Sequence, residues 1–541
     1  MANISKIIID KYRSIDHVEI NFPDNIPVVL IGENNAGKSN IIKAIDLILG
    51  EMYPKYHNPE DNEFYFRNRQ QAIEIKVDFS EKLGRFNQVK WSYNPSVDEP
   101  INFVGIDEYA SEKWPRNEER SDLICITVTA DRRLSYQLSY ISKSTMLSKL
   151  MIRFHRAMQS NGIVKSNLET KFDEIKSEFQ KIPEFKLFRD SLRDDFKELV
   201  SSMTYSLDID FEAYNPVNFF HALRLQANEN GQTRTLEELG TGEEEILALA
   251  FAHAYAKAFH GGVLLAIEEP ESHLHPLAQD WLAKKIEEMA KDGMQIILTT
   301  HSPAFINMLS LDGLALVNKN PISGTSIVQK TKAEFTAYCT EHGVPEDKIN
   351  NDNIGEFYNA NATKQILEGF FAKKVVLVEG PTESLALPIY LQAVGLEAKK
   401  EGVAVIPVNG KGNIAKWWRL FTAFNIPVYV IFDNDKDDDD VGTQRKDILK
   451  TIGVHEQVDS LLKTSDIHID AKFAIFGQDF ETSFRKAFAK YKDNEDKAKD
   501  LIDSGAKPFI ARFVAKKLSE EKVEEAGWEK IEALKSKIKI K

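Results

Sequence analysis

The sequence has very little cysteine, since only Cys125 and Cys339 occur in 541 residues. So few cysteines exclude a disulfide framework and a cysteine-based zinc site. They suit a reducing compartment, so we expect a cytoplasmic protein. The chain also lacks an apolar run long enough to span a bilayer and a basic-apolar signal pattern at its N-terminus, so we expect no membrane partner. The net charge of −14 argues against a protein coated in nucleic acid but leaves a local basic groove open.

The length exceeds what one hydrophobic core usually supports, so more than one domain is expected. Apolar β-like segments and helical segments alternate in 1–140 and again in 206–330, which predicts two parts of one α/β domain. Between them, 141–205 is charged and helix-periodic, and we interpret it as a helical insertion that serves dimerisation. The polar stretch 331–370 is interpreted as a linker with short helices. In 371–541 strands alternate with helices, the pattern of a parallel sheet, before a charged helical tail.

A phosphate-binding loop is predicted at "GENNAGKS", which fits the pattern GxxxxGKS, follows an apolar strand and opens a helix. Backbone N–H groups of such a loop cradle phosphates. Lys38 is expected to reach the β- and γ-phosphates of ATP, and Ser39 to ligate Mg²⁺. An ordinary glycine-containing turn is the alternative, but it does not require all eight positions and both flanks to agree. The residues predicted to bind ATP here are Gly32, Asn34, Asn35, Ala36, Gly37, Lys38 and Ser39.

Two further apolar strands end in residues suited to nucleotide hydrolysis. "VLLAIEEP" ends in Glu268, expected to hold Mg²⁺ directly or through water, and Glu269, expected to orient or deprotonate the attacking water. A strand that merely runs into a charged loop is a credible alternative for this motif alone, and a weak one beside the phosphate loop. His301 ends the strand of "LTTHSP" and is predicted to sense the γ-phosphate, although a lone histidine in such a place is more often structural.

The order of these motifs, with the turn "ELGTGEEE" before "IEEPESHLHP" and "TTHS", resembles ABC-type ATPases of the RecF, SMC and Rad50 kind. The turn by itself would be interpreted as a helix cap. The resemblance implies that Gly240, Thr241 and Gly242 form a signature motif that contacts ATP held by a second subunit, and hence a head-to-head homodimer. Gly240 stands where these ATPases often have serine, so Thr241 would supply the hydroxyl. "KYRSIDHVEI" resembles the N-terminal strand of the family, which implies that Arg13 approaches the nucleotide.

A second group of acids follows two apolar strands of the C-terminal region, "VVLVEGPTE" and "VYVIFDND". Glu379 and Glu383 lie on a strand–turn–helix, and Asp433 and Asp435, two apart at a strand end, can face the same way. The carboxyl ends of parallel strands form one crevice, and oxygen-only ligands suit Mg²⁺ or Mn²⁺. One or two such ions would support in-line attack on a phosphodiester. A solvated surface cluster is the alternative, which fits "KDDDD" at 436–440 better.

These acids resemble the Toprim domain of topoisomerases, primases and OLD-family nucleases. An ABC ATPase fused to a C-terminal Toprim domain is the arrangement of the OLD (overcoming lysogenization defect) family. "FGQDFETSF" resembles the OLD segment with further metal-binding acids, which implies Asp479 and Glu481 as ligands. "SGAKPFIARF" resembles the segment with a family lysine, which implies that Lys507 lies near the scissile phosphate and stabilises charge there; from the residues alone it is one lysine among many. The turn "VNGKGN" offers Gly410 and Gly412, where a phosphate could come close.

The predicted fold class is therefore α/β: an ABC-type ATPase domain with a helical insertion, followed by a Toprim parallel-sheet domain. The resemblance implies a DNA endonuclease that depends on divalent metal and that binds and hydrolyses ATP. Its cleavage would be gated by the nucleotide, and it would take part in anti-phage defence. Its implied partners are double-stranded DNA, a second copy through the ATPase (with a tetramer as the alternative), and a helicase or a retron reverse transcriptase with its msDNA.

A second hypothesis is a RecF- or SMC-like DNA-binding clamp whose Toprim domain only docks, but a docking module has no need of all four acids. A topoisomerase needs a nucleophilic tyrosine in a separate DNA-cleaving domain, for which the sequence offers no candidate region.

Overall fold

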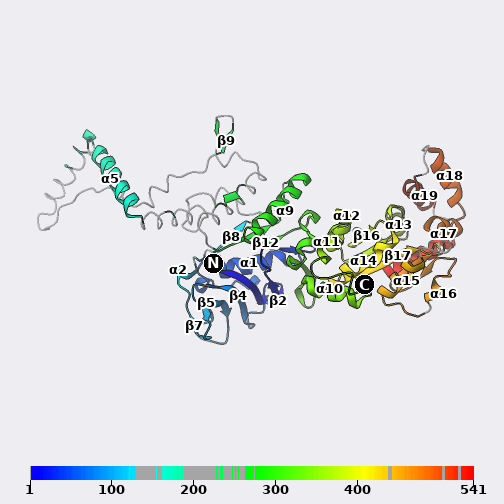
Figure 1. Cartoon of the computed structure of the whole chain (residues 1–541), viewed down its shortest axis with the longest axis horizontal. Coiled ribbons are helices and arrows are strands. Elements are labelled where there is room, and N and C mark those ends of the chain that lie inside the picture. Colours follow the sequence, from blue (N-terminus) through cyan, green and yellow to red (C-terminus); the bar gives the residue numbers. More distant parts are fainter. Residues whose placement is uncertain are drawn as a thin grey trace. The chain divides into compact units, whose positions relative to one another are not determined.

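The computed structural model describes 2–128 and 262–540, apart from 51, 121, 273, 436–441, 457, 502–505 and 522–524. Within 129–261 it describes chiefly 161–179, 181–184, 227–229 and 232–234. The chain divides into two units, and Figure 1 labels the helices and strands that the structure describes. The first is formed by 1–127 together with 260–541, and the second by 128–259.

The N-terminal part of the first unit is built on a twelve-stranded mixed sheet. Across the sheet the strand order is β7-β6-β5-β4-β1-β2-β14-β13-β3-β12-β11-β8, so segments distant in sequence become neighbours. The strands are β1 (Asn3–Tyr12), β2 (Ile15–Asn21), β3 (Val28–Ile31), β4 (Ile73–Leu83), β5 (Phe86–Tyr93), β6 (Ile101–Asp107), β7 (Glu112–Lys113), β8 (Leu123–Val128), β11 (Gly262–Glu268), β12 (Gln295–Thr299), β13 (Leu314–Asn320) and β14 (Gly324–Gln329).

The centre of this sheet is parallel. β3 lies between β12 and β13, with Val29 opposite both Leu298 and Leu314, and β11 pairs in parallel with β12. All four residues of β3 are buried, as is typical of a strand covered on both faces. Because β3, β11 and β12 run in the same direction, the residues that follow them gather at one edge of the sheet.

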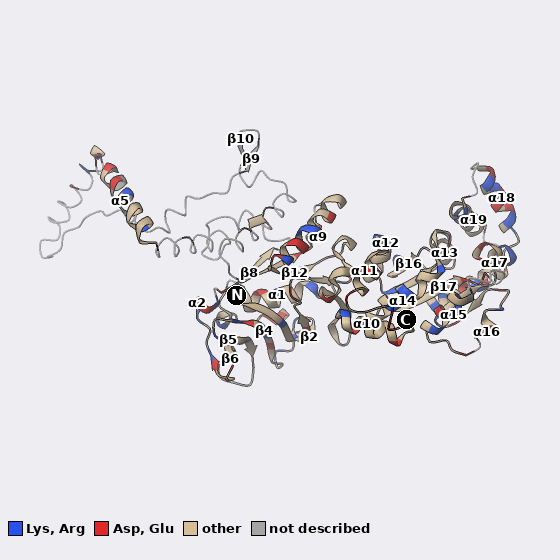
Figure 2. Cartoon of the chain, in the orientation of Figure 1, with Lys and Arg blue, Asp and Glu red and all other residues tan. Residues whose placement is uncertain are grey.

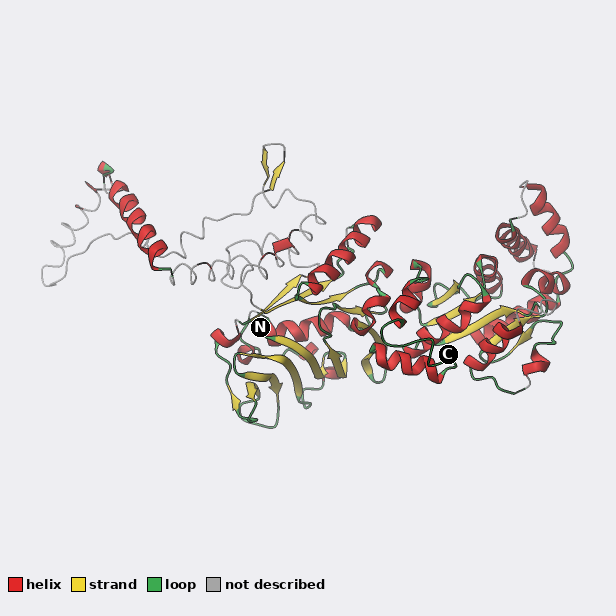
Figure 3. Ribbon diagram, viewed as in Figure 1, coloured by secondary structure: helices red, strands yellow, loops and turns green. Residues whose placement is uncertain are grey.

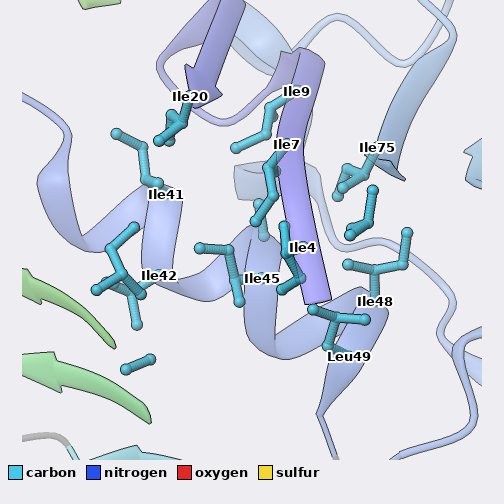
Figure 4. Close-up of a cluster of buried hydrophobic side chains, with 14 of the residues drawn as sticks. Ile4, Ile7, Ile9, Ile20, Ile41, Ile42, Ile45, Ile48, Leu49 and Ile75 are labelled. Carbon is cyan, nitrogen blue, oxygen red and sulfur yellow. The ribbon is translucent and has the colours of Figure 1, made fainter. Parts of the chain in front are cut away.

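Helix α1 (Lys38–Leu49) covers β1, β2 and β4, and Figure 4 shows its isoleucines pointing at theirs. Ile41, Ile45 and Ile48 recur at helical spacing and are fully buried. On β1, Ile7 and Ile9 are equally buried, whereas Ile8 between them points to the opposite side of the strand and is half-buried. This close packing holds the start of α1, and with it the loop before the helix, in a fixed position; truncating one of these isoleucines to alanine costs about 2–5 kcal/mol.

Helices lead from this sheet to the C-terminal part of the first unit. They include α9 (Pro276–Lys291) between β11 and β12, and η6 (Pro303–Phe305) and η7 (Met308–Gly313) after β12. The stretch predicted to be a linker with short helices contains α10 (Lys332–Glu341), α11 (Ile354–Asn359), α12 (Lys364–Leu367) and η8 (Glu368–Phe371). Short helices of 3₁₀ type also lie in the N-terminal part: η1 (Pro54–Tyr56), η2 (Asp61–Glu63) and η3 (Tyr65–Arg67), followed later by α2 (Asn117–Arg120).

The C-terminal part contains a five-stranded sheet of order β16-β15-β17-β19-β18, flanked by helices (Figure 3). All neighbours are parallel except β18, which pairs antiparallel with β19. The strands are β15 (Lys374–Val378), β16 (Val403–Pro407), β17 (Val428–Asp433), β18 (His468–Ile469) and β19 (Phe473–Phe476). The helices are α13 (Pro381–Ala393), η9 (Lys411–Asn413), α14 (Ile414–Ala423), α15 (Gly442–Thr451), α16 (Val458–Leu461), α17 (Phe480–Ala487), α18 (Tyr491–Leu501), α19 (Lys507–Glu521) and α20 (Ala526–Ile538). The predicted α/β class with a parallel C-terminal sheet is confirmed.

In the second unit the structure describes α5 (Gly162–Phe179), inside the range predicted to be a helical insertion, and the hairpin β9 (Ala227–Glu229) and β10 (Gln232–Arg234). Both signs of charge mix along α5, as they do along α9 and α18 (Figure 2). Among the helices that the structure describes, none combines the length and apolar character needed to cross a bilayer.

Two candidate active sites

The phosphate-binding loop joins β3 to α1 and depends on glycine at two positions. Gly32 has φ 142°, and a Cβ there would lie 2.2 Å from the Val317 carbonyl oxygen. Gly37 has φ 111°, and a Cβ there would lie 2.2 Å from Thr325 Oγ1. A side chain at either position therefore meets both a strained backbone and a neighbouring strand. The predicted motif consequently forms a tight loop against β13 and β14.

Lys38 is buried and connects this loop to the end of β12. Its Nζ donates to the carbonyl oxygens of Gly32 and Glu33, both at 2.9 Å, and lies 3.0 Å from Nε2 of His301. Burial lowers the pKa of Lys38 to about 8, although Glu269, Glu271 and Glu33 raise it. The structure thus brings together the lysine and the histidine that the sequence predicted to serve one nucleotide.

The acids after β11 lie at the same edge. Glu269 has the left-handed φ of 49°, and its N–H donates to the Thr299 carbonyl at 2.9 Å, which ties it to the end of β12. Its Oε1 lies 3.7 Å from Nε2 of His301. Burial lowers the pKa of His301, and Lys38 lowers it further, so the imidazole favours its neutral form. Glu268 ends β11 itself, one position before this turn.

Glu271 belongs to this site and was missed in the sequence. Its carboxylate accepts hydrogen bonds from the His301 N–H at 2.5 Å and from Thr300 Oγ1 at 2.9 Å. Burial raises its pKa. Glu271 therefore positions the loop that carries His301. The signal was a third acid in "EEPES", but only the parallel pairing of β11 with β12 brings it to the histidine.

The other predicted nucleotide residues lie as follows. Asn34 and Ser39 are exposed, Ala36 is buried, and Asn35 has φ 63°. Gly240, Thr241 and Gly242 lie outside the described residues.

Arg13 lies in the turn between β1 and β2 and is engaged within its own part of the fold. It donates to Glu63 Oε1 and to the Tyr12 hydroxyl, each at 3.2 Å. Burial raises the pKa of Glu63, but hydrogen bonds from His57, the Glu60 backbone and Tyr12 outweigh it and lower the pKa to about 2. Glu63 is thus an ionised partner that holds the Arg13 side chain.

The second site lies where β15 and β17 end. Oε1 of Glu379, just after β15, accepts a hydrogen bond of 2.5 Å from the Asp433 N–H at the end of β17. Glu383, in the first turn of α13, is 7% exposed, and its Oε2 caps the helix by accepting the Gly380 N–H at 2.9 Å. The two pairs of acids predicted from the sequence therefore converge, because β15 and β17 are parallel neighbours.

The residue between the two aspartates fixes which way they face. Asn434 is fully buried; its Nδ2 donates to the carbonyls of Leu462 and Thr464, and Arg445 donates to its Oδ1 at 2.9 Å. Asp433 and Asp435 consequently turn to the opposite side, toward Glu379. Asp435 has the left-handed φ of 41°, a strained conformation of the kind that gathers at functional sites.

Electrostatics of this cluster favour uptake of positive charge. Burial raises the pKa of Asp433 well above its ordinary value, and Glu379, Glu383 and Asp435 raise it further. Burial also raises the pKa of Glu383 to about 7, with Glu379 and Glu481 adding to it. Oδ1 of Asp433 is buried and accepts no hydrogen bond from the described residues. Crowded carboxylate oxygens with an unused acceptor fit a hard divalent cation.

Lys411 lies inside this cluster and was not predicted from the sequence. It is 5% exposed, and its Nζ lies 2.5 Å from Asp435 Oδ2 and 3.4 Å from Glu379 Oε1. The signal was its place between Gly410 and Gly412, but only the pairing of β16 with β15 brings that turn to the acids. Within the described part of the chain, no group of three or more acid, histidine or cysteine side chains is arranged so that it could hold a metal ion.

The residues implied by the OLD resemblance lie at different distances from the cluster. Glu481 is close enough to raise the pKa of Glu383. Asp479 caps α17, accepting the Thr482 N–H at 2.5 Å. Lys507 begins α19 and is exposed, and no hydrogen bond or ion pair within the described residues joins it to the four acids. The acidic run 436–440 lies outside the described residues.

The fold and the two sites define an ATPase with a phosphate-binding loop, fused to a Toprim domain. Family comparisons agree on both halves. A model described as "AAA domain … Type IV TA system" matches 28–307, more than half of the chain, and one described as "Overcoming lysogenization defect protein-like, TOPRIM domain" matches 370–435. The chain belongs to this AAA-domain family and has the OLD arrangement of an N-terminal ATPase and a C-terminal Toprim domain.

Similar proteins cover most of the chain. An OLD nuclease of Thermus scotoductus is 27% identical over 80% of this chain and 82% of its own length. The Old nuclease of Escherichia phage P2 is 22% identical over 87% of this chain and 84% of its own length. Endonuclease GajA of Bacillus cereus is 21% identical over 75% and 70%. The predicted membership of the OLD family is thereby confirmed.

Proposed function

We propose that this protein is an ATP-binding, divalent-metal-dependent DNA endonuclease of the OLD type, in which the ATPase gates cleavage by the Toprim domain. The observation that carries the proposal is the convergence of Glu379, Glu383, Asp433 and Asp435 at the edge of one parallel sheet. A protein that uses its Toprim domain only for docking gains nothing from four crowded, partly buried carboxylates, because their mutual repulsion costs stability. Relatives named nucleases over most of the chain support the same activity.

In the Toprim domain, Glu379, Asp433 and Asp435 would hold Mg²⁺ or Mn²⁺, with Glu383, Asp479 and Glu481 as further candidate ligands. Such an ion, when bound, polarises the scissile phosphodiester and favours ionisation of an attacking water. Glu383 caps its own helix, and burial raises its pKa to about 7 in the metal-free site. Lys507 stays a proposed stabiliser of charge on the phosphate.

In the ATPase, the loop Gly32–Ser39 would cradle the phosphates of ATP and Ser39 would ligate Mg²⁺ with Glu268. Glu269 would orient the attacking water, since it projects from a strained turn toward His301. A neutral His301 can accept or donate one hydrogen bond to the γ-phosphate or to that water. Arg13 and, from a second subunit, Gly240, Thr241 and Gly242 would complete the pocket in a homodimer.

Contacts within the first unit support gating. Lys373, just before β15, lies 3.8 Å from Glu33 of the phosphate loop, and the Phe371 ring lies 6.3 Å from that of His301. A nucleotide that moves Glu33 or His301 would therefore act on the segment that enters the Toprim sheet. The ion pair is largely exposed and the ring contact is only partly buried, so each is weak and gating would depend on both together.

The experiment is a cleavage assay on supercoiled and linear DNA with Mg²⁺ or Mn²⁺, with and without ATP. We expect the wild-type protein and the control Asp459→Ala to cut DNA, since the Asp459 side chain is 81% exposed. Asp433→Ala should bind ATP normally and cut nothing. Equal activity of wild type and Asp433→Ala would refute the assignment of the site. ATP-dependent DNA binding without any cleavage would support a RecF- or SMC-like clamp instead.

We further propose that the activity serves anti-phage defence, alone or with a helicase or a retron reverse transcriptase and its msDNA. Relatives named endonuclease GajA and Septu protein PtuA support this role. Expression of the wild-type protein should lower phage plating efficiency, and expression of Asp433→Ala should not. Equal plating on both strains would argue against it.

A further inference from the structure

Lys411 is held among the acids by the backbone that carries it. It follows Gly410, whose φ is 118° and whose N–H donates to the Glu379 carbonyl at 2.9 Å. On its other side, Nδ2 of Asn413 donates to the carbonyls of Val408 and Asn409. The turn is therefore hydrogen-bonded both to the end of β15 and within its own backbone. These bonds fix the position of the Lys411 backbone beside the four acids.

The ammonium group of Lys411 bridges two acids that belong to different strands. It lies 2.5 Å from Asp435 Oδ2 and 3.4 Å from Glu379 Oε1, and among the described residues no other cation forms an ion pair with any of the four acids. Glu379 Oε1 also accepts the Asp433 N–H. Lys411 thus engages one oxygen of Glu379 and one of Asp435, while Oδ1 of Asp433 accepts no hydrogen bond from the described residues.

We propose that Lys411 is an internal counter-ion of the metal-free Toprim site, and that a divalent ion must displace its ammonium group from Glu379 and Asp435. Two cations cannot occupy the same gap between the same carboxylates, because their repulsion opposes what each gains from the acids. Lys411 therefore keeps the acids together without metal and competes with the metal that binds there. This rests on the proposed function, because it assumes that the four acids take up a metal ion.

The test measures Mn²⁺ affinity of the full-length, nucleotide-free protein by calorimetry and by electron paramagnetic resonance of free Mn²⁺. Lys411→Met removes the charge at similar length, Lys411→Arg retains it, and Lys400→Met is the control, since the Lys400 side chain is 77% exposed. We expect Lys411→Met to bind Mn²⁺ about tenfold more tightly than wild type, a typical coupling between two sites. Lys411→Arg and Lys400→Met should stay within about twofold of wild type on the same scale.

Thermal unfolding provides a second measurement. In EDTA, Lys411→Met should melt below wild type, and saturating Mn²⁺ should remove most of that difference. A lysine with a purely structural role would lower both melting temperatures equally and leave Mn²⁺ affinity unchanged, which would overturn the proposal. Unchanged Mn²⁺ affinity with a raised KM for DNA would overturn it too, in favour of a phosphate contact.

Amine labelling of the wild-type protein tests the same displacement without any variant. Acetylation of Lys411, followed by mass spectrometry, should be slow in EDTA and faster with Mn²⁺ alone, relative to Lys400. Equal rates in the two conditions would count against displacement. If Asp433→Ala binds Mn²⁺ as wild type does, the proposed metal site itself fails; if binding depends on Asp433 but not on the charge of Lys411, only the present inference fails.

Discussion

Replacement of Glu383 by glutamine should stabilise the metal-free protein at alkaline pH, although it removes a candidate catalytic residue. Glu383 is buried in the first turn of α13, and its pKa is about 7 against an ordinary 4.5, first because of burial and then because of Glu379 and Glu481. Glutamine retains an oxygen that can accept the Gly380 N–H, so the helix cap survives the change. What the substitution removes is the negative charge.

The expected magnitude follows from the two pKa values. A difference of about 2.5 pKa units at ~1.4 kcal/mol each corresponds to ~3 kcal/mol. Because the folded-state pKa of this acid is raised, folding binds the proton more tightly. The stability is complete below about pH 4.5, is lost as the pH rises to about 7, and stays lost above it. Glu383→Gln has no carboxyl group to ionise, so it does not lose this stability. Its free energy of unfolding relative to wild type should therefore grow by ~2–3 kcal/mol between pH 5 and pH 8.

The assay is thermal unfolding of nucleotide-free protein in EDTA at several pH values, followed in the transition of the C-terminal part. An advantage of ~2–3 kcal/mol corresponds to roughly 5–10 °C for a domain of about 150–250 residues, the size range of the C-terminal part. The control is Glu397→Gln, the same substitution at a surface position, since the Glu397 side chain is 56% exposed. With Mn²⁺ the order should reverse, because the wild-type carboxylate then has a cation. The reasoning would be refuted if the Glu383→Gln protein were less stable than wild type at pH 8. It would also be refuted if the two melting temperatures differed by the same amount at every pH.

Three further substitutions, one of them with a matched glycine control, test other parts of the two sites. Lys38→Ala should abolish binding of a fluorescent ATP analogue while Mn²⁺ binding by the acids persists; loss of both would contradict separate sites. Gly32→Ala forces a Cβ to within 2.2 Å of the Val317 carbonyl and should lower stability by ~2–4 kcal/mol in denaturant unfolding and abolish ATP binding. Gly293→Ala, with a positive φ but open space, should cost only about 1 kcal/mol and retain ATP binding. Asn434→Ala should cost ~2–4 kcal/mol and weaken Mn²⁺ binding, because the carbonyls of Leu462 and Thr464 lose their donor and Arg445 keeps only the backbone carbonyl of this residue; unchanged Mn²⁺ affinity would show that the aspartates need no such anchor.

The sequence predicted the local motifs because each is encoded within one strand–turn–helix. The loop from Gly32 to Ser39 needs glycine where φ is positive and a lysine at the start of the helix, and both requirements are visible within eight residues. Likewise, the apolar strand that leads to Asp433 and the acid two positions on were visible in the sequence, although β17 ends at Asp433 and Asp435 has a left-handed φ of 41°. The expectation that parallel strands would bring Glu379 to Asp433 depended only on the pattern of a parallel sheet.

The sequence did not reveal ion-pair and hydrogen-bond partners that lie far apart in the chain. Lys411 stands between two glycines in a turn, and only the pairing of β16 with β15 places its ammonium beside Asp435. Glu271 looked like one more acid in a charged loop until β11 and β12 paired and brought it under His301.

Arg13 shows the same limit, since it is engaged by Glu63, fifty residues away. Local sequence thus determined which groups could do chemistry, because backbone geometry acts over a few residues. Tertiary structure decided which charges meet, because ion pairs and burial depend on distances in space that the chain sets only when it folds.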